Sequence, residues 1–374
     1  MNKKGQRLIF GLSGYIWVPI ALWLIAATIF FDKFAYQIEA FDAQVRVLLT
    51  TGQKDVREFN EDGIPLSYSA RNGEEFTSPF YVVHYGVMYS SAFAKRINRK
   101  RADWFMDDSI KYWNVPPNSY KDTYFKNSAD WVVEHISFRD GHAHLLYNFD
   151  WPYRNYPNGG LKAPWWSGLT DGYAIVLLLR ANDVYGGSKY MDAATELYKS
   201  VLAPIANGGS LGELNGDPWI EEYVDPRADP KKLSFVLNGM IYATYGIDAY
   251  ERYTNLANPM APKLYRSIAN NLHVFDRGDW SEYDAIGNAA NIKYHRVHVA
   301  LLKRIESETG KRAVAIIRER WEHGMNNAGY FWLLHGTLGV AKIQFILEYL
   351  FVLLVFPVSI TLFGLIRQRK SARF

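Results

Sequence analysis

Residues 172–185 read GYAIVLLLRANDVY and fit the 3.6-residue period of a helix. Further segments with helical spacing follow along the chain, and short turn-forming stretches separate them: 190–202, 236–252, 262–274, 295–308 and 312–323. Successive helices joined by such turns predict stacked helical hairpins. The expected fold is therefore mainly α, either an open bundle or an α/α toroid or incomplete α/α barrel.

The chain before this run supplies one more helix and a small β element. Apolar and small residues between Val82 and Phe93 form one helical stripe that begins after Pro79. Residues 135–149, HISFRDGHAHLLYNF, instead contain two alternating runs around Asp140-Gly141, which predicts a β-hairpin. No Gly-rich phosphate loop follows a strand, so a nucleotide-binding fold is not indicated.

Two apolar stretches lie near the ends of the chain. Residues 8–31 contain no charged side chain, and residues 343–366 contain one, Glu348. Each is long enough to cross the ~30 Å hydrocarbon layer of a bilayer. Basic residues flank both on the terminal side: Lys3, Lys4, Arg7, Arg367, Arg369, Lys370 and Arg373. This pattern predicts a two-pass membrane protein with cytoplasmic termini and an extracytoplasmic (periplasmic or lumenal) middle region; a buried core helix at either end is the alternative.

These features divide the chain into four parts. We expect a cytoplasmic tip and transmembrane helix over 1–32, a juxtamembrane or linker region over 33–79 and an α/α domain over 80–330. A C-terminal transmembrane helix and basic tail would occupy 338–374. The lipid bilayer would then be a partner through two helices.

Composition narrows the classes of function. Charged residues make up 21% of the 374 and the net charge is only +4, which argues against disorder and against a nucleic-acid-binding face. The 26 Tyr, 21 Phe and 12 Trp indicate either core and membrane-interface packing or a sugar-binding groove. The absence of cysteine excludes disulfides, thiol catalysis and Cys-ligated metals.

Several short blocks stand in a fixed order in the middle of the chain. They are WWSGLTDGYAI at 165–175 with LRA at 179–181, WIEEY at 219–223, SFVLNG at 234–239, FDRGDWSEYD at 275–284 and KYHRVH at 293–298. ADWV at 129–132 precedes them. Together they resemble the C-terminal catalytic region of D-glucuronyl C5-epimerases, which act on heparosan-type polysaccharides. The resemblance covers roughly Phe80 to Trp321.

The resemblance implies a carbohydrate epimerase, an isomerase acting on a glucuronate-containing polysaccharide without cofactor or metal. The catalytic residues it implies are Tyr223, Tyr283, Tyr294 and Glu222. The substrate-binding residues we expect are Trp165, Trp166, Asn238, Arg277, His295, Arg296 and His298.

Two departures from the family pattern bear on the substrate. The family has an arginine shortly after its Tyr-Asp pair, whereas here residues 285–287 read AIG. Arg277, Lys293 or Arg296 would have to substitute, or the substrate differs. The family's N-terminal β-barrel region is reduced to the short segment before Phe80.

Tyrosines suit this reaction because inversion at C5 needs a base, an acid on the opposite face and neutralisation of the enolate-like carboxylate. A phenolate is a strong base and a phenol a competent acid around its pKa of about 10. A nearby cation or hydrogen-bond donor would be needed to populate the phenolate near neutral pH.

Several of these residues also have plainer interpretations. Glu222 transfers a proton, orients Tyr223 or faces solvent beside Glu221. His295 and His298 are three apart on one helix face, which favours core hydrogen bonding over metal binding. Asn238 binds substrate or caps a helix. Trp165 and Trp166 stack on sugar or pack in the core, and Asp171 starts a helix while Asp276 and Asp279 form a turn.

Two other functions share these sequence features. A polysaccharide lyase uses the same proton abstraction and then expels the C4 oxygen. A non-catalytic glycan-binding subunit of a membrane export complex would need no proton transfer at all. The expected partners are accordingly a uronate-containing polysaccharide and, beyond it, a second copy of the chain or polysaccharide export machinery.

Overall fold

The computed structural model describes residues 57–68, 75–97, 113, 122–229 and 232–326, together with scattered positions between 21 and 49 and residues 350 and 354. The chain divides into two compact units. One comprises Met1–Val45 and His323–Phe374, and the other comprises Arg46–Glu322. The fold, the cavity and the candidate site described below belong to the second unit.

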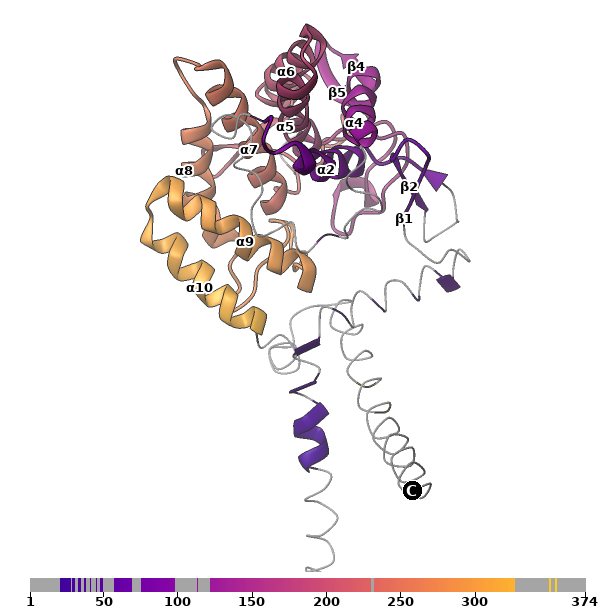
Figure 1. The fold of residues 1–374 in the computed structure, drawn as a ribbon. Coiled ribbons are helices and arrows are strands. Elements are labelled where there is room, and N and C mark those ends of the chain that lie inside the picture. The colour runs from indigo at the N-terminus through magenta and orange to yellow at the C-terminus, as the bar shows by residue number, and fades with distance from the viewer. Residues whose placement is uncertain are drawn as a thin grey trace, which may run out of the picture. The chain divides into compact units, whose positions relative to one another are not determined.

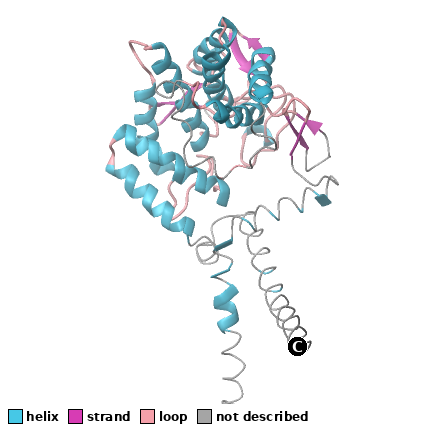
Figure 2. Cartoon of the chain, viewed as in Figure 1, coloured by secondary structure: helices cyan, strands magenta, loops and turns pink. Residues whose placement is uncertain are grey.

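The second unit is mainly helical (Figures 1 and 2). The helices of the described residues are α2 (Pro79–Ser90), α4 (Asp122–His135), α5 (Gly168–Tyr185), α6 (Ser188–Val201), α7 (Leu237–Thr254), α8 (Ala261–Asn271), α9 (Ile292–Thr309) and α10 (Arg312–Asn326). Three small antiparallel sheets accompany them in the described ranges. They pair β1 (Arg57–Phe59), β2 (Pro65–Tyr68) and β3 (Glu75–Phe76); β4 (Ile136–Arg139) and β5 (His142–Leu145); and β6 (Leu211–Leu214) and β7 (Asp217–Ile220).

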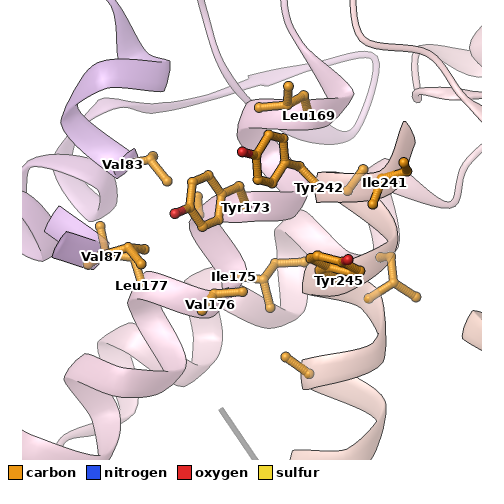
Figure 3. Close-up of a cluster of buried hydrophobic side chains, with 14 of the residues drawn as sticks. Val83, Val87, Leu169, Tyr173, Ile175, Val176, Leu177, Ile241, Tyr242 and Tyr245 are labelled. Atoms are coloured by element: carbon orange, nitrogen blue, oxygen red, sulfur yellow. The ribbon is translucent and has the colours of Figure 1, made fainter. Parts of the chain in front are cut away.

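Helix α5 lies at the centre of the unit and packs on α2, α6 and α7. Its residues from Gly168 to Ala181 are buried without interruption, so this helix is buried on all sides rather than on one face. Helices α5 and α7 approach closely, because a Cβ on Gly172 would collide with the backbone of Ala243 and one on Gly246 with the carbonyl of Gly172. Figure 3 shows the core between them, where Tyr173 and Tyr242 stack with ring centroids 5.5 Å apart.

The helices that follow α5 and α7 cover them from outside. Helices α6, α8 and α10 each bury one stripe and expose the opposite face, the pattern of a surface helix. In sequence order, buried and amphipathic helices therefore alternate as packed pairs, α5 with α6 and α7 with α8. This confirms the prediction of a mainly helical fold.

The helix starting at 172 in the sequence prediction begins four residues earlier in the structure. Ser167 is its N-cap, and the Ser167 hydroxyl accepts a hydrogen bond from the N–H of Thr170 at 3.2 Å. Asp171, predicted to start this helix, lies in its first turn. Its carboxylate accepts instead from the N–H of Leu145 at 3.0 Å and contacts His144 Nδ1 at 2.8 Å. Asp171 therefore ties the hairpin to the central helix.

The predicted β-hairpin is confirmed. Strands β4 and β5 pair in antiparallel register from Ile136–Leu145 to Arg139–His142. Asp140 and Gly141 connect them with φ angles of 50° and 81°, the left-handed pair that a two-residue hairpin turn requires.

The described part of the chain contains no helix with the length and apolar character needed to cross a membrane. Most of residues 8–31 and 343–366, on which the two membrane spans were predicted, lies outside the described residues. The spans, the topology and the division at residues 33, 80 and 338 stay predictions.

Candidate active site

A cavity of about 1020 Å³ opens among the helices and the small sheets of the second unit. Strands β2 and β3, the start of α2, the stretch 147–170 and single residues of later segments form its walls. Its lining is strongly aromatic: Tyr68, Phe76, Phe80, Tyr81, Trp113, Tyr147, Phe149, Trp151, Trp165, Tyr223 and Tyr294. Three of the residues predicted from the sequence to act on substrate, Glu222, Tyr223 and Tyr294, line it, as do Trp165 and Asn238.

The three predicted tyrosines lie together. The hydroxyl groups of Tyr223 and Tyr283 are hydrogen-bonded at 2.8 Å. The ring of Tyr294, in the first turn of α9, lies edge-on to that of Tyr283 with centroids 5.0 Å apart. Tyr283 therefore stands between the other two tyrosines, although these come from segments about 70 residues apart.

Glu222 completes this cluster. It follows β7 and is buried, and its Oε1 accepts a hydrogen bond from the Tyr283 hydroxyl at 3.4 Å. Its Oε2 accepts one from the side-chain amide of Asn238, at 3.5 Å. Burial raises the pKa of Glu222 to about 8, so this carboxyl changes its charge within the range in which enzymes work. The burial of Glu222 excludes the alternative in which its side chain faces solvent beside Glu221.

The block at 234–239 makes room for this carboxylate. A Cβ on Gly239 would collide with the side chain of Glu222, so only glycine fits on this turn of α7. Asn238 is the second residue of α7, whose N-cap, Val236, has no side-chain cap bond. Asn238 thus orients Glu222 rather than capping the helix.

The neighbouring acid, Glu221, has a different environment. Its carboxylate is buried and accepts hydrogen bonds from the Ser234 hydroxyl at 2.6 Å and the Phe235 N–H at 2.9 Å. Phe235 has a φ of 52°, a left-handed conformation that strains a non-glycine residue. Glu221 therefore holds the strained entry to α7 in place, and the turn positions Asn238 and Gly239.

The electrostatics of the tyrosines differ from the sequence-based expectation. Burial and the adjacent carboxylate of Glu222 raise the pKa of both Tyr223 and Tyr283 well above the usual value near 10. Both are phenols at neutral pH in the resting site. The carboxyl of Glu222, rather than a phenolate, is therefore the group in this cluster that ionises near neutrality.

A second layer supports the cluster from behind. The Tyr153 hydroxyl donates to Asp284 Oδ2 at 2.5 Å, and the ring of Tyr153 lies 5.0 Å from that of Tyr223. Asp284 also accepts from the N–H groups of Ile286 and Asn288, at 3.1 and 3.0 Å. The short loop after Tyr283 is folded around Asp284. Sequence reasoning missed Tyr153, which lies 131 residues before its partner.

His295 and His298 are buried in the core and do not line the cavity. The Nδ1 atoms of both contact the Ser281 hydroxyl at 2.9 Å, and His295 Nε2 contacts the carbonyl of Trp321 at 2.9 Å. Burial lowers the pKa of each to about 3, so both are neutral. His295 and His298 therefore make hydrogen bonds within the core, as the first of the two alternatives states. Within the described ranges, no group of three potential ligands is placed to hold a metal.

The two tryptophans of the first block have separate roles. Trp165 lines the cavity, stacks on Tyr147 with centroids 3.9 Å apart and lies 5.8 Å from the ring of Tyr223. Trp166 faces the other way, stacks on His144 at 4.6 Å and donates its indole N–H to the carbonyl of Gly209 at 3.3 Å. The packing alternative thus applies to Trp166, whereas Trp165 is also largely buried but borders the cavity.

The candidate substitutes for the family's arginine also differ in position. Arg277 forms an ion pair with Glu282, and neither Arg277 nor Arg296 lines the cavity. Lys293 does not line the cavity either, but its Nζ lies 3.6 Å from the ring centroid of Trp113 and 5.9 Å from that of Tyr294, two rings of the cavity wall. Lys293 is the best-placed of the three.

Sequence reasoning also missed the aromatic wall formed by Tyr147, Phe149 and Trp151. These three residues line the cavity and alternate with Asn148 and Asp150. Asn148 and Asp150 also line the cavity, so the available signal was the density of aromatic residues after the predicted hairpin.

Fold and cavity together define a helical domain that gathers tyrosines and a buried glutamate at an aromatic-lined cavity. Residues 140–323 match the family model of the D-glucuronyl C5-epimerase C-terminus. The region that carries the cluster therefore belongs to the family of D-glucuronyl C5-epimerase C-terminal domains.

Two curated relatives extend this comparison. A D-glucuronyl C5-epimerase of Caenorhabditis elegans is 30% identical over 220 residues, 53% of this chain and 34% of that protein. An uncharacterized protein of Methanocaldococcus jannaschii is 27% identical over 183 residues, 47% of this chain and 56% of that protein. The matched region spans about a third of the first relative and just over half of the second.

Proposed function

We propose that this chain is a uronate C5-epimerase that acts on a glucuronate-containing polysaccharide. The observation that carries the proposal is the hydrogen-bonded series Tyr223–Tyr283–Glu222 at a cavity that Tyr294 also lines. It provides two separate proton-transfer groups, which an inversion requires. Membership of residues 140–323 in the epimerase family supports a uronate epimerase activity in general.

In the proposed reaction the proton at C5 leaves from the face of the sugar that meets Tyr223. The phenol oxygen of Tyr223 accepts it while its own proton passes to Tyr283, and the proton of Tyr283 passes to Glu222. This relay needs Glu222 as a carboxylate, and it avoids a phenolate at Tyr223 and Tyr283, whose pKa values the site raises.

Reprotonation comes from the opposite face. Tyr294, on a different segment, donates its hydroxyl proton to C5 and completes the inversion. Solvent then returns a proton to Tyr294 and removes one from Glu222. No bond to the ring oxygen or to O4 breaks, so the product is the C5 epimer.

Lys293 neutralises the carboxylate of the substrate in this proposal. Removal of the C5 proton places negative charge on that carboxylate, and a cation nearby stabilises the enolate-like state. The position of its ammonium beside Trp113 and Tyr294 supports this role.

The proposal also includes the wider setting. The alternating buried and amphipathic helices would be an incomplete α/α toroid. The domain would stand outside the cytoplasm, held by membrane helices at both ends of the chain, and would act alone, as a homodimer or beside export machinery.

The experiment is an exchange assay in deuterated water with a heparosan-type polymer as the probe. We expect NMR to detect deuterium at the uronate C5 together with the epimerised sugar, and no ultraviolet-absorbing unsaturated product. An unsaturated product would indicate a lyase. Absence of both exchange and cleavage on uronate polymers would refute the proposal.

A further inference from the structure

Loop 153–156 contacts both tyrosines of the Tyr223–Tyr283 hydrogen bond, although none of its residues lines the cavity. The Tyr156 hydroxyl donates to the backbone carbonyl of Tyr223 at 3.0 Å. The centroid of the Tyr153 ring lies 5.0 Å from that of Tyr223 and 6.4 Å from that of Tyr283, edge-on to both. This loop is therefore placed to fix the two phenols relative to each other.

Asp284 joins the same loop to the segment that carries Tyr283. Its Oδ2 accepts hydrogen bonds from the Tyr153 hydroxyl at 2.5 Å and from the side-chain amide of Asn288 at 2.6 Å. Its Oδ1 accepts from the N–H groups of Ile286 at 3.1 Å and Asn288 at 3.0 Å. Because each oxygen accepts two hydrogen bonds, neither is left to carry a proton, and Asp284 is a buried carboxylate.

Further hydrogen bonds connect the backbones of the two segments. The side-chain amide of Asn155 donates to the carbonyl of Ile286 at 3.2 Å, and that of Asn288 donates to the carbonyl of Arg154 at 2.9 Å. The N–H of Tyr283 donates to the carbonyl of Asn288 at 2.7 Å, which closes the second loop. The two loops are therefore fixed to each other as well as to the tyrosines.

The bond from Tyr153 to Asp284 persists at the pH at which the relay works. Burial raises the pKa of Tyr153 well above its usual value near 10, and the carboxylate of Asp284 raises it further. Tyr153 therefore keeps its proton while Glu222, whose pKa is about 8, ionises. A phenol that donates to a buried carboxylate makes a charge-assisted hydrogen bond, which is stronger than a neutral one.

The distance between the phenol oxygens of Tyr223 and Tyr283 matters for the proposed relay. The two residues are 60 positions apart in the chain, so local backbone structure does not set this distance. A proton passes between two oxygens only at hydrogen-bond distance. A displacement of about 1 Å at a reacting group lowers a rate by as much as about 10²-fold. Groups that hold the two tyrosines therefore act on the reaction through them.

We propose that Tyr153 and Asp284 are positioning residues for proton transfer. Their hydrogen bond holds the hydroxyls of Tyr223 and Tyr283 at the distance that the relay requires. The proposal rests on the proposed function for the reaction that the relay serves. It gives a role in the reaction to two side chains that do not line the cavity.

Tyr153→Phe tests this role because it removes the hydroxyl bonded to Asp284 and keeps the ring beside Tyr223. In the exchange assay with a heparosan-type polymer, kcat should fall about 10- to 10²-fold while KM stays unchanged, since Tyr153 does not line the cavity. Tyr265→Phe is the matched control. It removes another buried tyrosine hydroxyl that donates to a buried aspartate, Asp248, at 3.0 Å, and it lies outside the cavity. Its kcat should equal that of the unmodified chain.

Crystal structures of the two variants give a readout that needs no activity. The hydroxyls of Tyr223 and Tyr283, 2.8 Å apart in the unmodified chain, should lie beyond hydrogen-bond distance in Tyr153→Phe and stay in contact in Tyr265→Phe. An unchanged distance in Tyr153→Phe, or a kcat equal to that of Tyr265→Phe, would overturn the positioning role. If the unmodified chain exchanges no deuterium, separated hydroxyls in Tyr153→Phe support the positioning role while the epimerase is refuted.

Discussion

The hydroxyl groups of Tyr223 and Tyr283 are 2.8 Å apart, and the Tyr283 hydroxyl also donates to the buried carboxylate of Glu222. Two phenols whose pKa values are raised thus share hydrogen bonds with one carboxyl whose pKa is about 8. These hydrogen bonds connect Tyr223, at the cavity wall, through Tyr283 to the buried carboxylate of Glu222. This relationship underlies the predictions below.

Removing the middle hydroxyl should break the relay. Tyr283→Phe keeps the ring and deletes the oxygen that joins Tyr223 to Glu222, so C5 exchange should fall about 10²–10⁴-fold, the usual contribution of an acid–base group. Initial rates of deuterium incorporation measure it. Tyr198→Phe is the matched control, because it also removes a tyrosine hydroxyl bonded to a buried glutamate, Glu251, but lies outside the cavity. Comparable activity of the two variants would rule out the relay.

Activity should depend on the ionisation of Glu222. The carboxylate is the form that accepts a proton, and its pKa is raised to about 8. The value of kcat/KM should therefore be low at pH 6 and rise about tenfold per pH unit until it levels near pH 8. Glu222→Gln should lose most activity and this pH dependence. A rate that is flat between pH 6 and 9 would contradict the assignment.

Because its pKa is raised, an ionised Glu222 should lower the free energy of unfolding at high pH. A carboxyl that is easier to protonate in the folded chain stabilises the fold fully below its unfolded pKa near 4.5, and this contribution is lost as pH rises through about 8. Glu222→Gln should therefore unfold at a temperature close to that of the unmodified chain at pH 5 and several degrees higher at pH 9. Calorimetry measures both, with exposed Glu213→Gln as control. A gap that narrows with pH would show the opposite electrostatics.

Local features of this fold could be predicted from the sequence better than contacts between distant segments. Asp140-Gly141 predicted the β4–β5 hairpin because a two-residue turn is a property of adjacent residues. Periodicity predicted α2 and α5 to α10 but not α4, and α5 begins four residues before its predicted start because Ser167 caps it.

The candidate site shows the limit more sharply. Motif blocks identified Tyr223, Tyr283, Tyr294 and Glu222, but burial decides how they ionise, and burial depends on packing. Burial raises the pKa of Glu222, and α7, with Asn238 and Gly239, packs against this carboxylate. Trp165 and Trp166 are adjacent in sequence, yet only their opposite directions in the fold separate a cavity wall from the core.

Lys293 should control substrate affinity. A hydrogen-bonded charge pair contributes about 1.5–3 kcal/mol, so Lys293→Gln should raise KM for a uronate polymer about tenfold or more. Steady-state exchange kinetics give this value. Lys263→Gln, on the exposed face of α8, changes the net charge equally and should leave KM unaltered. Equal effects of the two substitutions would mean that only the overall charge matters.

The central claim is that separate groups act on the two faces of C5, and isotope transfer in a single turnover tests it most directly. Excess protein is mixed with a C5-protonated uronate polymer in deuterated water and quenched before the reaction reverses. We predict that almost every epimerised unit carries deuterium, because Tyr294 supplies a solvent-derived proton while the unreacted sugar keeps its original hydrogen. Epimerised units that retain the substrate hydrogen would show one group serving both faces and would contradict the account.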